Sequence, residues 1–233
     1  MELQTSPDHG RPLRYIDIVT AAFAVTSIVS GVTAGKLIDI TGFVLPASAI
    51  IFPLAYIFGD ILTEVYGFRR SRRVIWIGFG CSVAGSVVFG VVAELPSPGW
   101  FEGAPAYKVV LGQIPLIAVA GWLAFFLGEM SNSVVLSILK TLTKGRGLWL
   151  RAVVSTIVGE LIDTAIFLSI AFHATFTTPQ LIKTIFTLYL WKVAVEVLFL
   201  PVTYFICRQL KRAEGVDVYD YGVMYNPFGF RSQ

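Results

Sequence analysis

Four pairs of polar or charged side chains interrupt otherwise apolar stretches of this 233-residue chain. Within each pair the members are three or four positions apart, a spacing that places both on one face of a helix. The pairs are Asp60 and Glu64, Glu129 and Asn132, Glu160 and Asp163, and Lys192 and Glu196. Buried carboxylates of this kind accept hydrogen bonds, bind a cation or carry a proton. The pattern therefore predicts polar helix faces that recognise a ligand rich in hydrogen-bond donors.

The composition places these faces in a membrane. Hydrophobic residues make up 55% of the chain and charged residues only 14%, and the mean hydropathy is +0.74. A soluble domain has about 25% charged residues. The net charge of +3 lies in short basic clusters between apolar runs, which is typical of topology signals and not of nucleic-acid binding. The two cysteines and two histidines are isolated in the sequence, so no metal site or cofactor is predicted.

Six segments are long enough to cross the membrane, which takes about 20 apolar residues in a helix. They cover approximately 15–35, 43–65, 73–94, 110–136, 149–172 and 184–207. We therefore predict an all-α integral membrane protein, a bundle of six transmembrane helices. The membrane domain spans 15–210, between an N-terminal segment (1–14) and a short C-terminal tail (211–233). Pro46 and Pro53 are expected to kink the second span and Pro201 the sixth.

Lys and Arg predict the orientation, because they are enriched in cytoplasmic loops. Alternate loops and the two termini carry most of the 18 Lys and Arg residues. This set is Arg11, Arg14, Arg69, Arg70, Arg72, Arg73, Lys140, Lys144, Arg146, Arg151, Arg208, Lys211, Arg212 and Arg231. The opposite side carries Lys36, Lys108 and Lys183. We therefore expect the terminal segment and the tail to be cytoplasmic.

The simplest arrangement points the four polar faces at one cavity. The acids outnumber Lys192, which favours a ligand with donors, a cation or protonated acids. A structural alternative is that Lys192 pairs with Glu196 in its own helix and the acids bond to neighbouring Ser and Thr. Glycines precede the first acid in three spans, at Gly59, Gly128 and Gly159, and small residues let helices approach closely.

Aromatic residues are frequent near these faces. They are Trp122, Phe125, Phe126, Phe167, Tyr189 and Trp191. Most of them are expected to face lipid or to pack against other helices. One or two, with Phe126 and Trp191 as the candidates, are expected to stack on a flat ligand. A planar heterocycle with an amide N–H and an exocyclic amine would satisfy both the carboxylates and the rings.

Several motifs carry a family resemblance. The block FGDILTEVYGFRRSRRVIWIGF at 58–79 resembles the signature of the queuosine-precursor transporter family, also called the VUT family. Four further segments are similar, namely GEMSNS at 128–133, the acid pair at 159–163, WKVAVEVLFLP at 191–201 and GVDVYDYGVMYNPF at 215–228. The resemblance extends from about residue 20 to residue 228, and the 58–79 block is its most specific part.

The resemblance implies a six-span importer of 7-deazapurine precursors of queuosine in a bacterial-type inner membrane. The substrate would be 7-cyano-7-deazaguanine, 7-aminomethyl-7-deazaguanine or a related base. The polar residues of spans four to six would line its path, although Glu129 and Asn132 depart in part from the family pattern. We expect Glu160 or Asp163, with Glu196, to accept the guanidine-like edge, and Lys192 to balance charge or to donate to the ring carbonyl. Asp60 and Glu64 would form a cytoplasmic gate with an arginine of 69–73, or cap the helix end.

Two other functions fit parts of the sequence. A substrate-binding component of an energy-coupling-factor vitamin importer would also have six spans, and it would need partner subunits because the chain has no GxxxxGK[ST] loop. An intramembrane enzyme is disfavoured, because GxGD, HExxH and Ser/His pairings are missing from the sequence. Ser27, Gly31 and Gly35 are spaced for helix packing or for a homodimer seam.

Overall fold

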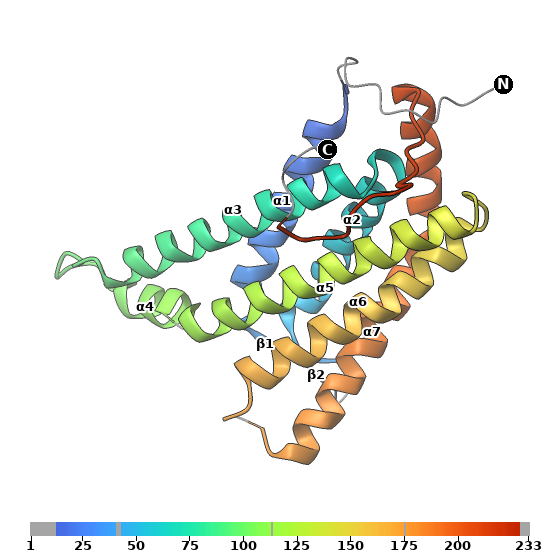
Figure 1. Cartoon of the computed structure of the whole chain (residues 1–233). Coiled ribbons are helices and arrows are strands. Elements are labelled where there is room, and N and C mark those ends of the chain that lie inside the picture. Colours follow the sequence, from blue (N-terminus) through green and yellow to red (C-terminus); the bar gives the residue numbers. More distant parts are fainter. Residues whose placement is uncertain (1–12, 41–42, 113, 175, 229–233) are drawn as a thin grey trace.

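The computed structural model describes residues 13–228, apart from 41–42, 113 and 175 (Figure 1). Helices make up nearly all of it, with one short hairpin near the N-terminus. In chain order the elements are α1 (Ile16–Thr33), β1 (Leu37–Ile40), β2 (Phe43–Pro46), the 3₁₀ helix η1 (Ala47–Ile50), α2 (Phe52–Tyr66), α3 (Phe68–Glu94), α4 (Ala104–Gly112), α5 (Ile114–Leu142), α6 (Leu148–Ala171) and α7 (Thr178–Glu214).

Five helical stretches among the described residues are long and apolar enough to cross a membrane. They are α1, α3, α4 together with α5, α6 and α7. Their outer faces expose large apolar side chains, and Val87, Val88 and Val91 of α3 are each more than half exposed. A soluble protein would bury such a band, whereas lipid tails cover it at no cost. The prediction of a helical membrane protein is therefore confirmed in its main feature.

The second predicted span differs from its prediction. Residues 43–65 do not form one continuous helix, because β2 and η1 precede α2. With 15 residues, α2 is about 22 Å long, less than the roughly 30 Å of the hydrocarbon core. Pro46 ends β2, and Pro53 lies in the first turn of α2, where its missing N–H costs no hydrogen bond. Neither proline kinks a helix.

The hairpin also corrects the all-α prediction. Strands β1 and β2 pair antiparallel, with Leu37 opposite Pro46 and Ile38 opposite Leu45. The amide of Ala47 donates to the carbonyl of Lys36 at 2.7 Å, which extends the pairing by one bond. These strands were hidden in the sequence because each has only four residues within apolar surroundings.

Helix α2 lies at the centre of the protein, in contact with α1, α3, α5 and α7 (Figure 1). Most of its side chains are buried. Helices α5 and α6 pack along their lengths through Gly128 and Gly159. A Cβ atom added at either glycine would lie 2.9 Å from the other's carbonyl oxygen, so the close approach requires glycine at both positions.

Two groups of buried apolar side chains enclose the centre. One, which includes Ile61, Leu62 and Phe68, lies toward the end where α3 begins. The other, which includes Leu45 and Leu168, lies toward the hairpin. The polar faces predicted from the sequence are buried as well, on α2, α5, α6 and α7.

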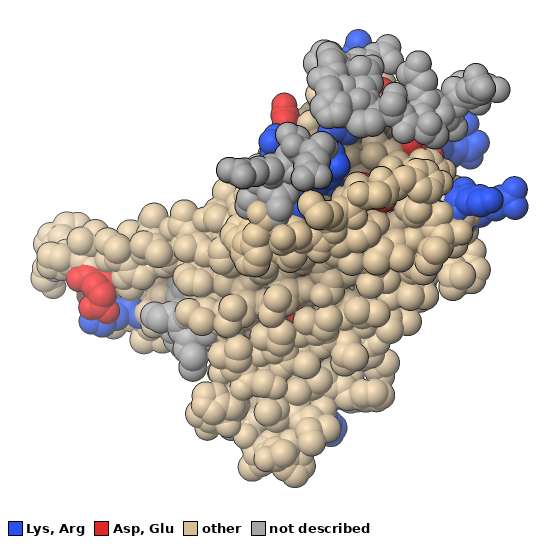
Figure 2. Space-filling view, viewed as in Figure 1, with Lys and Arg blue, Asp and Glu red and all other residues tan. Residues whose placement is uncertain are grey.

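Charged side chains gather at one end of the molecule. Figure 2 shows Lys and Arg around the beginning of α1 and the end of α7, and a broad surface on the face drawn that is nearly free of charge. Helix α3 begins at Phe68 and not at 73, so Arg69–Arg73 form its first turns. We call this end of the bundle the basic end.

The C-terminal tail packs against the basic end. Asp220 Oδ2 accepts hydrogen bonds from the Phe68 amide at 2.9 Å and from Ser137 Oγ at 2.6 Å. Trp76 Nε1 donates to the carbonyl of Pro227 at 2.9 Å, and Arg72 donates to the carbonyl of Asn226 at 2.6 Å. The tail, predicted to be a simple extension, is therefore bound across the ends of α3 and α5.

Candidate functional site

Nine polar side chains from α2, α5, α6 and α7 meet in the interior, and none is more than 4% exposed. We call them the inner cluster. Its members are Tyr56, Asp60, Glu129, Asn132, Thr156, Glu160, Asp163, Lys192 and Glu196. All six predicted polar residues of spans four to six belong to it. Asp60, predicted to lie at the cytoplasmic rim, belongs to it as well.

Lys192 is the cation of the inner cluster. Its Nζ lies 2.9 Å from Glu160 Oε2, and it also donates to Asp163 Oδ2. The same Nζ lies 4.0 Å from the centre of the Phe52 ring, a cation–π geometry. Lys192 therefore pairs with two acids of α6, and not with Glu196 of its own helix as in the structural alternative.

Two further contacts link the helices of the inner cluster. Asn132 Nδ2 donates to Asp60 Oδ1 at 2.8 Å, which joins α5 to α2. Thr156 Oγ1 donates to Glu196 Oε1, which joins α6 to α7. Each acid that receives such a bond is partly compensated for the loss of water.

Other polar atoms of the inner cluster have no hydrogen-bond partner within the described part of the chain. They are both carboxylate oxygens of Glu129, both of Glu160, the Tyr56 hydroxyl, Asn132 Oδ1 and Glu196 Oε2. Such atoms are costly to bury and mark positions where a ligand or a proton can be accommodated. Within the described ranges, no three His, Cys, Asp or Glu residues are arranged to hold a metal ion.

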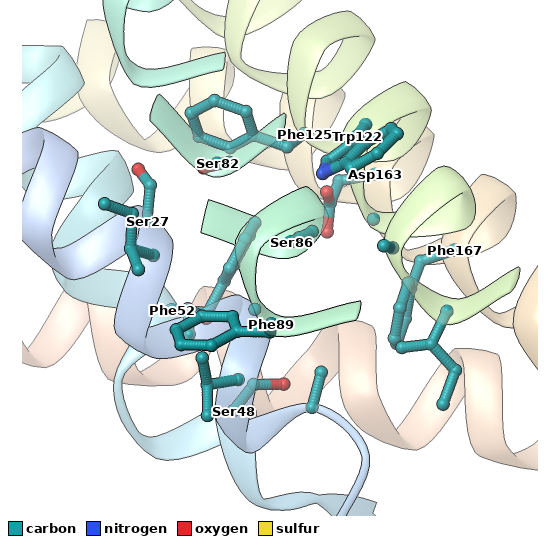
Figure 3. A pocket seen from close by; sticks show the side chains of 18 of the residues that line it. Ser27, Ser48, Phe52, Ser82, Ser86, Phe89, Trp122, Phe125, Asp163 and Phe167 are labelled. Carbon is teal, nitrogen blue, oxygen red and sulfur yellow. The ribbon is translucent and has the colours of Figure 1, made fainter. Parts of the chain in front are cut away.

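A cavity adjoins the inner cluster on the side away from the basic end (Figure 3). Asp163 and Lys192 are the charged residues of its lining. Aromatic rings of Phe52, Phe89, Trp122, Phe125 and Phe167 also line it, together with Ser27, Ser30, Ser48, Ser82 and Ser86. The cavity thus combines an ion pair, hydroxyl groups and flat apolar surfaces.

The aromatic residues chosen from the sequence lie elsewhere. Phe126 packs against Trp76 and Phe79, and Trp191 donates its Nε1 to the carbonyl of Ala49 at 3.1 Å. Neither lines the cavity. Helical spacing would have indicated two of the rings that do line the cavity. Phe52 precedes Asp60 by two turns and Phe167 follows Asp163 by one turn, so each ring shares a helix face with an acid of the inner cluster.

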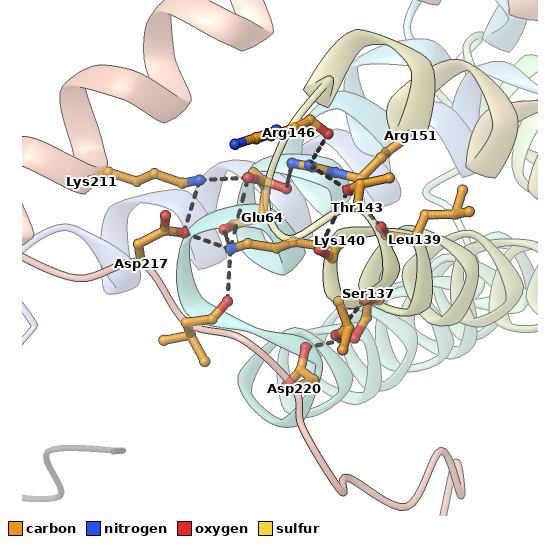
Figure 4. A network of polar contacts seen from close by, with 12 residues as sticks. Glu64, Ser137, Leu139, Lys140, Thr143, Arg146, Arg151, Lys211, Asp217 and Asp220 are labelled. Atoms are coloured by element: carbon orange, nitrogen blue, oxygen red, sulfur yellow. Dashed lines mark hydrogen bonds and ion pairs between the residues drawn. The ribbon is translucent and has the colours of Figure 1, made fainter. Parts of the chain in front are cut away.

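Glu64 belongs to a second polar group at the basic end, which we call the Glu64 network (Figure 4). Arg151 Nη2 donates to Glu64 Oε2 at 2.8 Å, and Lys211 pairs with Oε1. Lys140 Nζ lies 3.8 Å from the same Oε1. The predicted partner, an arginine of 69–73, is not among these residues, because α3 carries its arginines elsewhere on the basic end.

The tail completes the Glu64 network through Asp217. Its Oδ1 lies 2.7 Å from Lys140 Nζ and 2.9 Å from Lys211 Nζ. Burial alone would raise the pKa of Asp217, but the two ammonium groups outweigh burial and hold this pKa below its ordinary value. The contact therefore contributes stability above the ordinary aspartate pKa, and the contribution is lost as pH falls through the lowered pKa.

Three hydroxyl groups lie between the inner cluster and the Glu64 network. Thr63 Oγ1 lies 2.8 Å from Ser71 Oγ and 3.0 Å from Ser133 Oγ, and all three side chains are buried. Along α2 and α5 the polar groups thus follow one another from the cavity to the basic end.

A family model described as "Putative vitamin uptake transporter" matches residues 46–206. The chain belongs to this family. The matched part begins at the end of β2 and contains the whole inner cluster and Glu64. The family assignment made from the 58–79 block is confirmed.

Three curated relatives agree with this family. The chain is 28% identical to the "Probable queuosine precursor transporter" of Bacillus subtilis strain 168, over 72% of this chain and 74% of the relative. It is 25% identical to the "Queuosine precursor transporter" of Escherichia coli strain K12, over 70% and 72%. It is 24% identical to the "Probable queuosine precursor transporter" of Haemophilus influenzae, over 64% and 63%. No solved structure matches the chain significantly.

These relatives are bacterial and are named as transporters, not enzymes. Together with the apolar helices, they identify this family member as a multi-pass protein of a bacterial inner membrane with a role in transport. The inner cluster and its cavity are the candidate site for that role. Charged residues buried within a membrane-spanning region are typically functional, and two of those in the inner cluster, Asp163 and Lys192, line the cavity.

Proposed function

We propose that the protein imports 7-deazapurine precursors of queuosine, such as 7-cyano-7-deazaguanine or 7-aminomethyl-7-deazaguanine, through the inner membrane. The observation that carries the proposal is the Asp163–Lys192 pair at the floor of an aromatic cavity. The names of the three relatives support the same substrate class.

The chemistry of the base matches this floor. A guanine-like ring presents N–H donors next to a carbonyl acceptor on one edge. Asp163 accepts from the donors and Lys192 donates to the carbonyl. Because Glu160 and Glu196 do not line the cavity, Asp163 is the acid that an incoming base meets first. Phe52, Trp122 and Phe167 supply apolar faces for the ring.

The transport path continues from this floor to the basic end. It passes the inner cluster, then the hydroxyls of Thr63, Ser71 and Ser133, and then the Glu64 network. In the present state the cavity adjoins the inner cluster on one side, while the Glu64 network and the tail cover the other. We interpret this arrangement as a state that receives substrate from outside the cell and is closed toward the cytoplasm.

The topology follows from the same orientation. We propose six crossings with both termini cytoplasmic, in which the hairpin, η1 and α2 together make the second crossing. The basic end then faces the cytoplasm, as expected for clustered Lys and Arg. A C-terminal green fluorescent protein fusion is expected to fluoresce and a C-terminal alkaline phosphatase fusion to be inactive. The reverse pair of results would contradict the topology.

Import is tested by Asp163→Asn in a bacterial strain that cannot make the precursor. The substitution keeps the shape of the side chain but removes the charge that accepts the donors of the base. Loss of a charge-assisted hydrogen bond, about 1.5–3 kcal/mol, should lower uptake of labelled 7-cyano-7-deazaguanine about ten- to a hundredfold.

The matched control is Glu94→Gln, which neutralises an exposed acid that pairs with Lys108 and is not part of the cavity lining, and this variant should import normally. Purified protein alone in proteoliposomes should also import the base, whereas a substrate-binding component that depends on partner subunits would not. An Asp163→Asn protein that inserts normally and imports at the unaltered rate would overturn the assigned site.

A further inference from the structure

We infer that Glu129 of α5 is a proton-binding site, and that proton passage through its carboxyl group drives uptake of the base. The inference rests on the proposed transport function and adds the source of energy for it. Nothing in the family description or in the names of the relatives specifies that source.

The first step of the argument is the isolation of Glu129. It is fully buried, and neither carboxylate oxygen has a hydrogen-bond partner within the described residues. Asp60 and Glu196 each receive a hydrogen bond, from Asn132 and Thr156 respectively. Glu160 makes no hydrogen bond within the described residues, but it and Asp163 each form an ion pair with Lys192, so Glu129 is the acid of the inner cluster with neither kind of contact among the described residues. An ionised carboxylate without a partner costs far more to bury than a protonated one. Glu129 therefore carries a proton in this state.

The second step is the shape of the space around Glu129. A Cβ atom added at Gly59 would lie only 1.7 Å from Glu129 Oε1 and 2.7 Å from its Cδ. The carboxyl group thus occupies a hollow that exists because α2 has a glycine at this position. The hollow holds the acid against the backbone of α2, one residue before Asp60.

The third step is the charge around this hollow. The titratable groups that face Glu129 come from α2, α6 and α7 and are Tyr56, Asp60, Glu160, Asp163 and Glu196. All of them are acids or a phenol, and Lys192 is already paired with Glu160 and Asp163. A proton neutralises a carboxylate in such surroundings without further ligands, so a proton is the cation that we assign to this position.

The fourth step connects Glu129 to the substrate cavity. Tyr56 is fully buried, and its hydroxyl has no partner among the described residues. A Cβ atom added at Gly128 would lie 2.4 Å from the Tyr56 hydroxyl and 2.7 Å from Asp163 Cβ. The phenol therefore lies beside both the residue before Glu129 and the acid that lines the cavity. A base that binds Asp163 changes the surroundings of Tyr56 and, with it, those of the proton on Glu129.

The direction of proton movement follows from the order of the residues. Glu129 takes up a proton from the cavity side, and its neighbour toward the basic end is Asp60, which Asn132 contacts at 2.8 Å. Glu64 follows one helical turn later on α2. One proton released in this direction accompanies the neutral base, so that import uses the inward proton gradient.

The test uses the full-length protein in proteoliposomes, with an imposed gradient that is alkaline inside and with labelled 7-cyano-7-deazaguanine outside. The unaltered protein and the Glu94→Gln control should accumulate the base, and a protonophore should abolish accumulation. Glu129→Gln should lose at least about 90% of gradient-driven accumulation, which is a tenfold reduction of the coupled step. It should retain exchange of internal for external base, because glutamine resembles the protonated acid.

A second measurement reads the proton directly. The carbonyl stretching band of a protonated carboxyl group should be present in the infrared spectrum of the unaltered protein and reduced in Glu129→Gln. Uptake that does not depend on the pH gradient, or that depends on a sodium gradient, would overturn the proton coupling but not the proposed transport function. Failure of the unaltered protein to move any 7-deazapurine would overturn the proposed function, and the coupling with it.

Discussion

Replacement of Lys192 by methionine is expected to abolish import and to destabilise the protein strongly. Lys192 is 4% exposed and contacts both Glu160 and Asp163, and the substitution leaves these two acids without a cation. Removal of one partner from a buried ion pair costs about 3–5 kcal/mol. The loss should appear as a lower melting temperature of the purified protein in detergent and as an import rate at background.

The matched control is Lys183→Met, which makes the same chemical change at an exposed position of the same helix and should leave both measurements unaltered. A double variant separates folding from recognition. In Lys192→Met/Asp163→Asn one of the two uncompensated charges is gone, so part of the stability should return. Import should remain absent, since neither group of the recognition floor is left. A Lys192→Met protein with an unaltered melting temperature would show that the ion pair does not support the fold.

The sequence predicted the long helices well because their signal is simple. A run of about 20 apolar residues between charged clusters is enough to place α1 and α6 within one or two residues at each end. Helices α3 and α7 are also found, but they begin five and six residues earlier than predicted, and α7 ends seven residues later. The same rule failed at 43–65, where a hairpin strand, a 3₁₀ turn and α2 have the length and hydropathy of one span. Hydropathy measures how apolar a segment is, and it does not show where the backbone changes from strand to helix.

The inner cluster was predictable for a similar reason. A charged residue within a span must face the interior, so Glu129, Glu160 and Lys192 could be placed together before any fold was known. Their pairing could not be predicted, because it depends on how far α6 is shifted along α5 and α7. The separation of Asp60 from Glu64 shows the same limit. The two acids share one face of α2, but one helical turn divides the inner cluster from the Glu64 network.

Neutralisation of Glu64 is expected to open the basic end. Glu64 is the acid that Arg151 and Lys211 share, and it lies 3.8 Å from Lys140. In Glu64→Gln the two lysines keep Asp217 as their acidic partner, whereas Arg151 loses the acid with which it pairs in the network. Loss of charge-assisted hydrogen bonds worth about 1.5–3 kcal/mol should shift the equilibrium between the closed and open states at least about tenfold toward the open state.

The opening can be measured with a thiol placed between the two polar groups. Ser133 is fully buried next to Thr63, on the cavity side of the Glu64 network. In inside-out vesicles, a membrane-impermeant thiol reagent should modify Ser133→Cys slowly, and at least about ten times faster when Glu64→Gln is added. The control is the double variant Ser133→Cys/Glu94→Gln. It should react slowly, because Glu94 is exposed and lies far from the basic end. Equal modification rates in the Glu64→Gln and Glu94→Gln double variants, together with a lower melting temperature for Glu64→Gln alone, would contradict a gate. They would show that the Glu64 network stabilises the helix ends. Faster modification would show that closure of the cytoplasmic side depends on the one buried acid that Arg151 and Lys211 share.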